Sequence, residues 1–161
     1  MRGIVLSLLL AAGLLPVCAG DDVDELLRQL DNAIAAKAQY REAHEQRIQL
    51  LKSEYRRSRS PELRVGLSRR LAEAYATYIN DSALVYLHRS IAEAEQMGDH
   101  QLAARCRSEL VVQCTNAMLT EEGFINLGRI DSRILDAEGK TAYYRAAGNL
   151  YNVLSDAMSN L

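Results

Sequence analysis

The sequence lacks the short motifs by which most enzymes are recognised. It contains no G-x-S-x-G nucleophile motif, no glycine-rich phosphate loop, and no cysteine paired by a known local signature with a histidine. His44-Glu45 begins like the zinc-protease motif H-E-x-x-H, but Ile48 stands where the second histidine would have to be. The other two histidines, His88 and His100, are well separated along the chain. We therefore expect no catalytic residue, no metal site and no cofactor.

The sequence also lacks any stretch in which apolar and polar residues alternate for long enough to make a convincing β-strand. Apolar residues instead recur at intervals of three and four, which is the spacing of one face of an α-helix. Ser60-Pro61 can start a helix and Gly98 can end one. We predict an all-α fold of about seven helices, with an N-terminal helical hairpin over residues 20–59 and repeated helix pairs over residues 60–161.

Long hydrophobic runs are missing as well. The apolar stretch over residues 4–15 is too short to span a membrane comfortably. It follows Arg2 and precedes Pro16 and small residues, which is the layout of a secretory signal peptide. Residues 1–19 are therefore predicted to direct export, so that the protein would reside in the periplasm or cell envelope.

The position of cleavage has more than one interpretation. Val17 and Ala19 fit the small-residue rule for a cut between Ala19 and Gly20. Cys18 allows a second possibility, attachment of lipid as in a bacterial lipoprotein, although Val17 departs from the residues that normally precede such a cysteine. A third possibility is that the segment stays attached as an anchor.

Positive charge is not in excess. Removal of residues 1–19 would leave 18 basic and 21 acidic residues, a net charge of −3, which argues against a nucleic-acid partner. The arginines between residues 56 and 70 close one helix or lie near Glu62 and Glu73, so they are interpreted as a solvated face. Cys106 and Cys114 would lie about 12 Å apart along one helix, too far to form a disulfide, and are predicted to be core residues.

The strongest positive signal is an internal repeat. Residues 104–118 align with residues 144–158 at a constant offset of 40, so that Arg105 meets Arg145 and Leu110 meets Leu150. One step earlier the offset is 39, and Leu71 then meets Leu110. Because the turns recur in step with the apolar positions, the sequence predicts a repeated helix pair.

The stretch from Asp81 to Asp99 reads D-S-A-L-x-Y, then alanines, then Gly-Asp. It resembles the second helix and exit turn of tetratricopeptide-type repeats, and the resemblance covers residues 61–161. It implies antiparallel helix pairs stacked as a right-handed tetratricopeptide-like solenoid.

Three features define the layout of the whole chain: the signal peptide, the L-L-x-x-L-D-x-A-I helix at residues 26–34 and the arginine-rich second helix. This layout resembles the N-terminal extracytoplasmic part of Bacteroides-type envelope regulator-like proteins of unknown function. In that family a transmembrane helix, a coiled coil and a cytoplasmic output segment follow the repeat domain. The resemblance implies that this chain is the extracytoplasmic part of a longer sensor-like protein, truncated at its C-terminus.

A ladder of polar residues lies beside the core stripe of the first helix of each predicted pair. In stacked helix pairs these first helices line the concave surface, where arginine and asparagine could bind an extended peptide. The alternative, that the ladder is ordinary solvated surface, stays open. The candidate residues are Arg70, Glu73, Arg105, Glu109, Asn116, Arg145, Asn149, Asn152 and Asp156.

Together these features predict an exported helical-repeat domain that binds a protein or peptide, as the sensory or scaffold segment of a larger envelope regulatory protein. One alternative is a structural helical spacer with no ligand, and a distant one is a hydrolase with no recognisable motif. A downstream segment or lipid at Cys18 could add membrane attachment. We also expect self-association through the last helix, whose apolar residues have no following helix to cover them: Tyr143, Leu150, Leu154, Met158 and Leu161.

Overall fold

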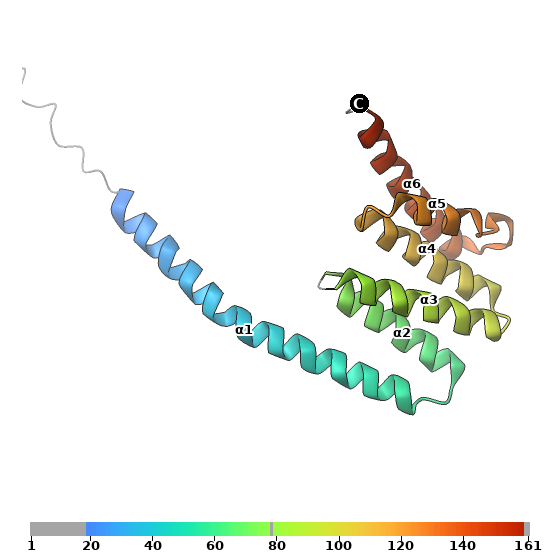
Figure 1. The fold of residues 1–161 in the computed structure, drawn as a ribbon, viewed down its shortest axis with the longest axis horizontal. Coiled ribbons are helices and arrows are strands. Elements are labelled where there is room, and N and C mark those ends of the chain that lie inside the picture. Colours follow the sequence, from blue (N-terminus) through green and yellow to red (C-terminus); the bar gives the residue numbers. More distant parts are fainter. Residues whose placement is uncertain (1–18, 78, 160–161) are drawn as a thin grey trace, which may run out of the picture. The chain divides into compact units, whose positions relative to one another are not determined.

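The computed structural model describes residues 19–77 and 79–159, and all the regular structure in these ranges is helical (Figure 1). The absence of strands in the described ranges confirms the all-α prediction. The predicted signal peptide, with Cys18, lies outside them. The elements are α1 (Ala19–Arg57), α2 (Pro61–Ala76), α3 (Asn80–Gln96), α4 (His100–Asn116), α5 (Thr120–Gly128), the short 3-10 helix η1 (Ser132–Ile134) and α6 (Ala137–Ser159).

The N-terminal hairpin expected over residues 20–59 is not found. Helix α1 runs from Ala19 to Arg57 without a turn, so the two apolar stripes predicted as separate helices belong to one helix. The stretch between the stripes, residues 33–39, is mostly alanine, the strongest helix former, and has no glycine or proline to stop the helix. The chain divides into two compact units between Ala43 and His44.

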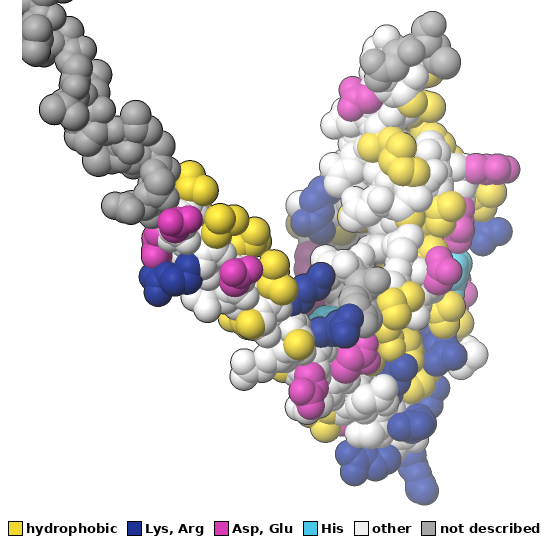
Figure 2. All heavy atoms as spheres, turned by 60° about the vertical axis from the view of Figure 1, so that its left-hand side comes forward, with side chains coloured by type: hydrophobic (Ala, Val, Ile, Leu, Met, Phe, Trp, Pro, Cys, Tyr) yellow, Lys and Arg dark blue, Asp and Glu magenta, His cyan; other side chains and the backbone are white. Residues whose placement is uncertain are grey.

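The described part of the first unit, residues 19–43, is entirely helical. Its apolar residues lie along one side, where Figure 2 shows them gathered in a row. Each is more than half exposed, and the five are Val23, Leu26, Leu27, Leu30 and Ile34. Among the described residues of the chain, no helix is long and apolar enough to cross a membrane.

The second unit, residues 44–161, contains the stacked helix pairs. Helix α2 packs against α3, α3 against α4, and α4 against both α5 and α6, so that the first helices of successive pairs follow one another through the unit (Figure 1). This arrangement confirms the predicted tetratricopeptide-like solenoid, with α2, α4 and α6 as the first helices.

Three apolar clusters hold this unit together. Ile48 and Leu51, from the last part of α1, are buried against Leu71 and Tyr75 of α2. The second cluster joins α2, α3 and α4, and the third joins α4, α5 and α6. Cys106 and Cys114 are buried and unpaired in the second cluster, as the sequence predicted.

Helices α3 and α4 end in the same turn, which explains why the turns recur with the repeat. Gly98 and Met118 follow the two helices with φ of 72° and 61°. In each turn the next backbone N–H returns to a carbonyl in the last helical turn, from Asp99 to Ala94 at 3.0 Å and from Leu119 to Cys114 at 2.8 Å. This is the Schellman motif, in which a left-handed residue ends the helix.

Candidate functional site

Two neighbouring hollows lie along the first helices of the repeat unit. The α2–α4 hollow has a volume of about 630 Å³ and is lined by Gly66, Arg69, Arg70, Ala72, Glu73, Ala76, Leu87, Glu109 and Gln113. The α4–α6 hollow has a volume of about 670 Å³ and is lined by Arg69, Arg105, Ser108, Glu109, Val112, Glu138, Thr141, Ala142, Arg145 and Asn149. Each is large enough for the side chains of a bound segment.

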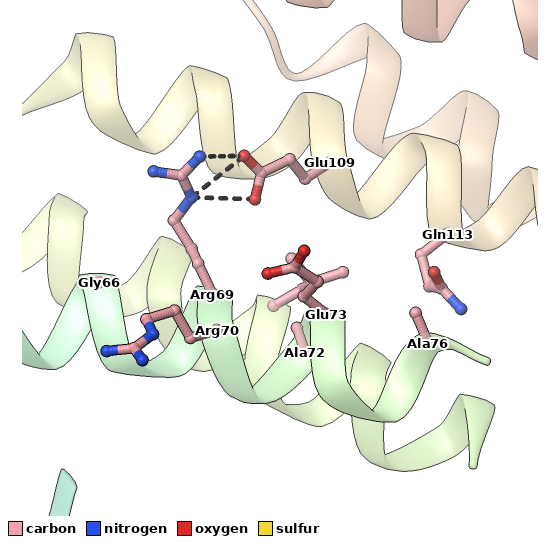
Figure 3. Close-up of a pocket in the computed structure, with 9 residues that line it drawn as sticks. Gly66, Arg69, Arg70, Ala72, Glu73, Ala76, Glu109 and Gln113 are labelled. Carbon is pink, nitrogen blue, oxygen red and sulfur yellow. Dashed lines mark hydrogen bonds and ion pairs between the residues drawn. The ribbon is translucent and has the colours of Figure 1, made fainter. Parts of the chain in front are cut away.

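An ion pair between Arg69 and Glu109 contributes to both hollows. The Arg69 Nε donates to both carboxylate oxygens of Glu109 at 3.0 Å, and a terminal guanidinium nitrogen donates as well. Figure 3 shows the Arg69 guanidinium directed at Glu109 from α2 to α4. Hydrogen bonding to Glu109 raises the pKa of Arg69 further, so Arg69 stays charged at all ordinary pH values. These two charges already satisfy each other.

The α2–α4 hollow keeps one acidic group without a cation. The side chain of Glu73 extends into the space between α2 and α4, beside the apolar floor of Ala72, Ala76 and Leu87 (Figure 3). Arg70 lines the same hollow, but its guanidinium lies on the side of α2 away from Glu109. Among the described residues no ion pair or hydrogen bond engages the Glu73 carboxylate.

The α4–α6 hollow has two arginines at equivalent positions of successive repeats. Arg105 donates to the Glu138 carboxylate at 2.7 Å and lies 3.9 Å from that of Asp136. Its Nε is buried and has no acceptor among the described residues. Arg145 is exposed, and within the same described ranges neither it nor Asn149 has an ion-pair or hydrogen-bond partner for its side chain.

The structure brings six of the nine candidate residues into these hollows. They are Arg70, Glu73, Arg105, Glu109, Arg145 and Asn149. Asn116, Asn152 and Asp156 are exposed and line neither hollow. Asn116 is the last residue of α4, and Asn152 and Asp156 lie further along α6 than Asn149, the last residue of that helix to line a hollow.

Sequence reasoning missed Arg69, Gln113 and Glu138 as lining residues. The acidic residues near Arg64 and Arg69 in the sequence favour a solvated face, but in the structure each arginine pairs with a carboxylate on another helix. One signal was present: Arg69 and Glu109 are separated by 40 residues, one repeat length, on successive first helices. A basic and an acidic residue so spaced can meet across adjacent repeats.

A second polar cluster joins α1, α2 and α3. The Glu93 carboxylate accepts hydrogen bonds from the Tyr55 hydroxyl at 2.6 Å and from the Arg64 Nε at 2.9 Å. The Arg64 guanidinium also lies 4.4 Å from the centre of the Tyr55 ring. Burial and the hydrogen bond to Glu93 raise the pKa of the Tyr55 phenol. The cluster is closed and structural, since its groups bind one another.

His44 and His88 contact different parts of the chain. The Nε2 of His44 is 2.8 Å from the carbonyl oxygen of Ala74, and that of His88 is 3.2 Å from a Glu122 oxygen. In the part of the chain that the structure describes, no group of three or more histidine, cysteine, aspartate and glutamate side chains is placed to hold a metal ion.

Comparison with known proteins gives one match. Residues 34–160 match the family described as the SusR N-terminal TPR domain. No curated protein and no solved structure gives a significant match to the chain. The matched range includes both hollows and the whole second unit except residues beyond 160.

Proposed function

The chain belongs to the SusR N-terminal TPR domain family, and from that premise we propose that it is an exported binding domain, the sensory or scaffold segment of a larger envelope regulatory protein. Domains of the tetratricopeptide type generally mediate protein interactions and are typically non-catalytic. The partner in this proposal is a protein or peptide segment that lies along α2, α4 and α6.

The observation that carries the proposal is the pair of adjoining hollows, which are lined by polar side chains that have no ion-pair or hydrogen-bond partner among the described residues. Stacked helix pairs present extended surfaces, and their first helices commonly bind the ligand. Glu73 and Arg145 are charged and have no partner among the described residues, while Ala72, Ala76 and Ala142 supply apolar contact area. A helical spacer has no need of two such hollows, so these groups favour binding over a purely structural role.

Filling the hollows tests the proposal. The purified protein is screened against a displayed library of short peptides, and the selected peptides are measured by fluorescence anisotropy. Ala76→Trp and Ala142→Trp place a large ring in one hollow each and should abolish binding. Ala92→Trp, at an exposed position of α3, is the matched control and should bind normally. If the selected peptides still bind both Ala76→Trp and Ala142→Trp, the two hollows are excluded as the binding site.

Export has a separate test. The signal-peptide layout of residues 1–19 supports secretion with cleavage after Ala19. Mass spectrometry of membrane-extracted and soluble protein should find Gly20 at the N-terminus. A diacylated Cys18 at the N-terminus would establish the lipoprotein alternative, and an intact Met1 would establish an uncleaved anchor.

A further inference from the structure

We infer that the bound segment is an extended peptide carrying one basic and one acidic side chain, the basic one held at Glu73 and the acidic one at Arg145. The inference rests on the proposed function and names the chemistry of its ligand. It follows from which charges in the two hollows are already satisfied and which are not.

In the α2–α4 hollow, Glu73 and Arg70 have no ion-pair or hydrogen-bond partner among the described residues, and of the two it is Glu73 that extends into the space between the helices (Figure 3). Arg69 is engaged by both oxygens of Glu109, and Arg70 directs its guanidinium away from that carboxylate (Figure 3). Glu73 lines this hollow together with the apolar Ala72 and the polar Gln113. A lysine or arginine from a partner would find its counter-ion at Glu73 and apolar surface for its methylene stem.

In the α4–α6 hollow the uncommitted charge is positive. Arg145 has no partner among the described residues, and Arg105 is held only by carboxylates whose side chains are 77% and 50% exposed, those of Glu138 and Asp136. Exposed ion pairs contribute little, so Arg105 can exchange Glu138 for a ligand at small cost. Two arginines that line one hollow suit a carboxylate, whose two oxygens can accept hydrogen bonds from guanidinium groups.

The hollows also set the spacing of the two ligand charges. Neighbouring helices lie about 8–10 Å apart, and Glu73 on α2 is separated from Arg145 on α6 by α4, so the two anchors lie about 16–20 Å apart. An extended chain advances about 3.3 Å per residue, so the charged residues should be roughly five to six positions apart. Neither hollow is lined by an aromatic side chain among the described residues, so a sugar ring would have no flat apolar surface to stack on. Asn149 and Thr141 can instead hydrogen-bond to a peptide backbone.

The test uses four matched short peptides and the purified protein. One peptide carries lysine and glutamate five positions apart; in the others glutamine replaces the lysine, the glutamate, or both. Fluorescence anisotropy should show that the doubly charged peptide binds about tenfold more tightly than either singly neutralised one. High salt should reduce this difference because it screens partly exposed charges.

Two substitutions assign the charges to their sites. Arg145→Gln should reduce the preference for the ligand glutamate, with Arg105 still present, and keep the preference for lysine. Glu73→Gln should remove the preference for lysine and keep the preference for glutamate. Both residues are exposed, so neither change should disturb the fold, which circular dichroism checks. The controls Arg129→Gln and Glu121→Gln alter exposed charges outside both hollows and should leave all four affinities unchanged.

The outcomes separate this inference from the proposed function. If Arg145→Gln and Glu73→Gln show the same charge preference as the wild-type protein, the assignment of charges to these two residues is wrong, while the two hollows remain the proposed binding surface. A preference for only one of the two ligand charges would overturn the two-charge inference as well. If folded protein binds none of these peptides and the library screen also selects none, the inference and the proposed function both fail.

Discussion

Glu93 is the only charged residue that is buried among the residues that the structure describes. It accepts hydrogen bonds from Tyr55 and Arg64, and its other oxygen lies 3.5 Å from the Ser68 hydroxyl. Its side chain is 11% exposed while that of Arg64 is 36% exposed, so water partly screens the pair. The cluster ties the last part of α1 to α2 and α3 through polar contacts rather than through packing alone.

We predict that Glu93→Ala lowers the free energy of unfolding by about 2–3 kcal/mol, because it leaves Tyr55 and Arg64 without their acceptor. The partial exposure of Arg64 keeps the loss below that of a fully buried pair. Urea denaturation measures the effect. Glu121→Ala, at an exposed site, should change stability by less than about 0.5 kcal/mol. An equally small effect of Glu93→Ala would show that water replaces the carboxylate.

Cys114 gives stability a dependence on alkaline pH. Its side chain is fully buried, and burial, with a smaller contribution from the charge of Glu122, raises the pKa of the thiol from 9.0 to about 12. The folded protein therefore keeps the thiol protonated where the unfolded chain ionises it. The resulting stabilisation is fully present below pH 9.0 and is lost as the pH rises toward 12.

We expect the urea midpoint of the wild-type protein to fall as the pH is raised above 9.0, with up to about 1.4 kcal/mol lost per pH unit from this thiol. Cys114→Ala should be less stable at neutral pH because it leaves a small cavity, but its decline with alkaline pH should be shallower. Equal slopes for the two proteins would mean that Cys114 ionises with similar ease in the folded and unfolded states. Tyr55 and Cys106, whose pKa values are also raised, contribute to both slopes.

At the scale of the helix, the turns after α3 and α4 form a natural comparison. Both end in a left-handed residue, which is glycine at position 98 and methionine at position 118. Glycine adopts this conformation without strain, whereas a residue with a Cβ adopts it at a cost of about 1 kcal/mol. Met118 is also 69% exposed, so its side chain contributes little packing to offset that cost.

We therefore predict opposite effects of two substitutions on thermal unfolding. Gly98→Ala should lower stability by about 1 kcal/mol, even though an added Cβ would meet no atom within 4 Å, because the backbone conformation itself disfavours alanine. Met118→Gly should raise stability by up to about 1 kcal/mol for the same reason. If both changes were neutral, the backbone would have to relax out of the left-handed region at little cost.

The elements also show where local sequence was informative. Ser60 accepts a hydrogen bond from the Leu63 N–H at 3.2 Å, and Asp99 accepts one from Leu102 at 2.9 Å, so both caps are visible in the sequence. The hairpin predicted over residues 20–59 would need a turn between its two apolar stripes, but residues 33–39 contain neither glycine nor proline. This alanine-rich stretch favours helix, and α1 continues through it.

At the scale of the whole molecule, the repeat offset predicted the helix pairs correctly because each pair carries its own apolar stripe, caps and turn. It also identified Arg105 and Arg145 as equivalent positions, which the structure places around one hollow. What it did not provide was the pairing of charges across repeats. Arg69 and Glu109 are one repeat apart, and only the packing of α2, α4 and α6 decides which carboxylate each arginine meets.

The surface of α6 differs from the prediction. Leu150 is fully buried against α4 and α5, Tyr143 and Leu154 are partly buried, and Leu161 lies outside the described residues. The stripe named from the sequence is therefore largely covered, because α6 packs on two earlier helices at once. The large apolar residues left exposed on this helix are Tyr144, Tyr151 and Met158.

Tyr144, Tyr151 and Met158 recur at intervals of seven residues and are 64%, 56% and 66% exposed, so they form one continuous apolar face along α6. We predict that two copies associate through this face, and that light scattering shows a mass above that of the monomer as concentration rises. Replacing the three residues by serine should restore the monomer, whereas Val85→Ser and Ile125→Ser, at similarly exposed apolar sites, should not.

The N-terminal part of α1 is the competing contact, since Leu27 and Leu30 are also more than half exposed. Leu27→Ser with Leu30→Ser decides between the two faces: a dimer that survives this change and disappears with the α6 variant belongs to α6, and the reverse result would assign it to α1.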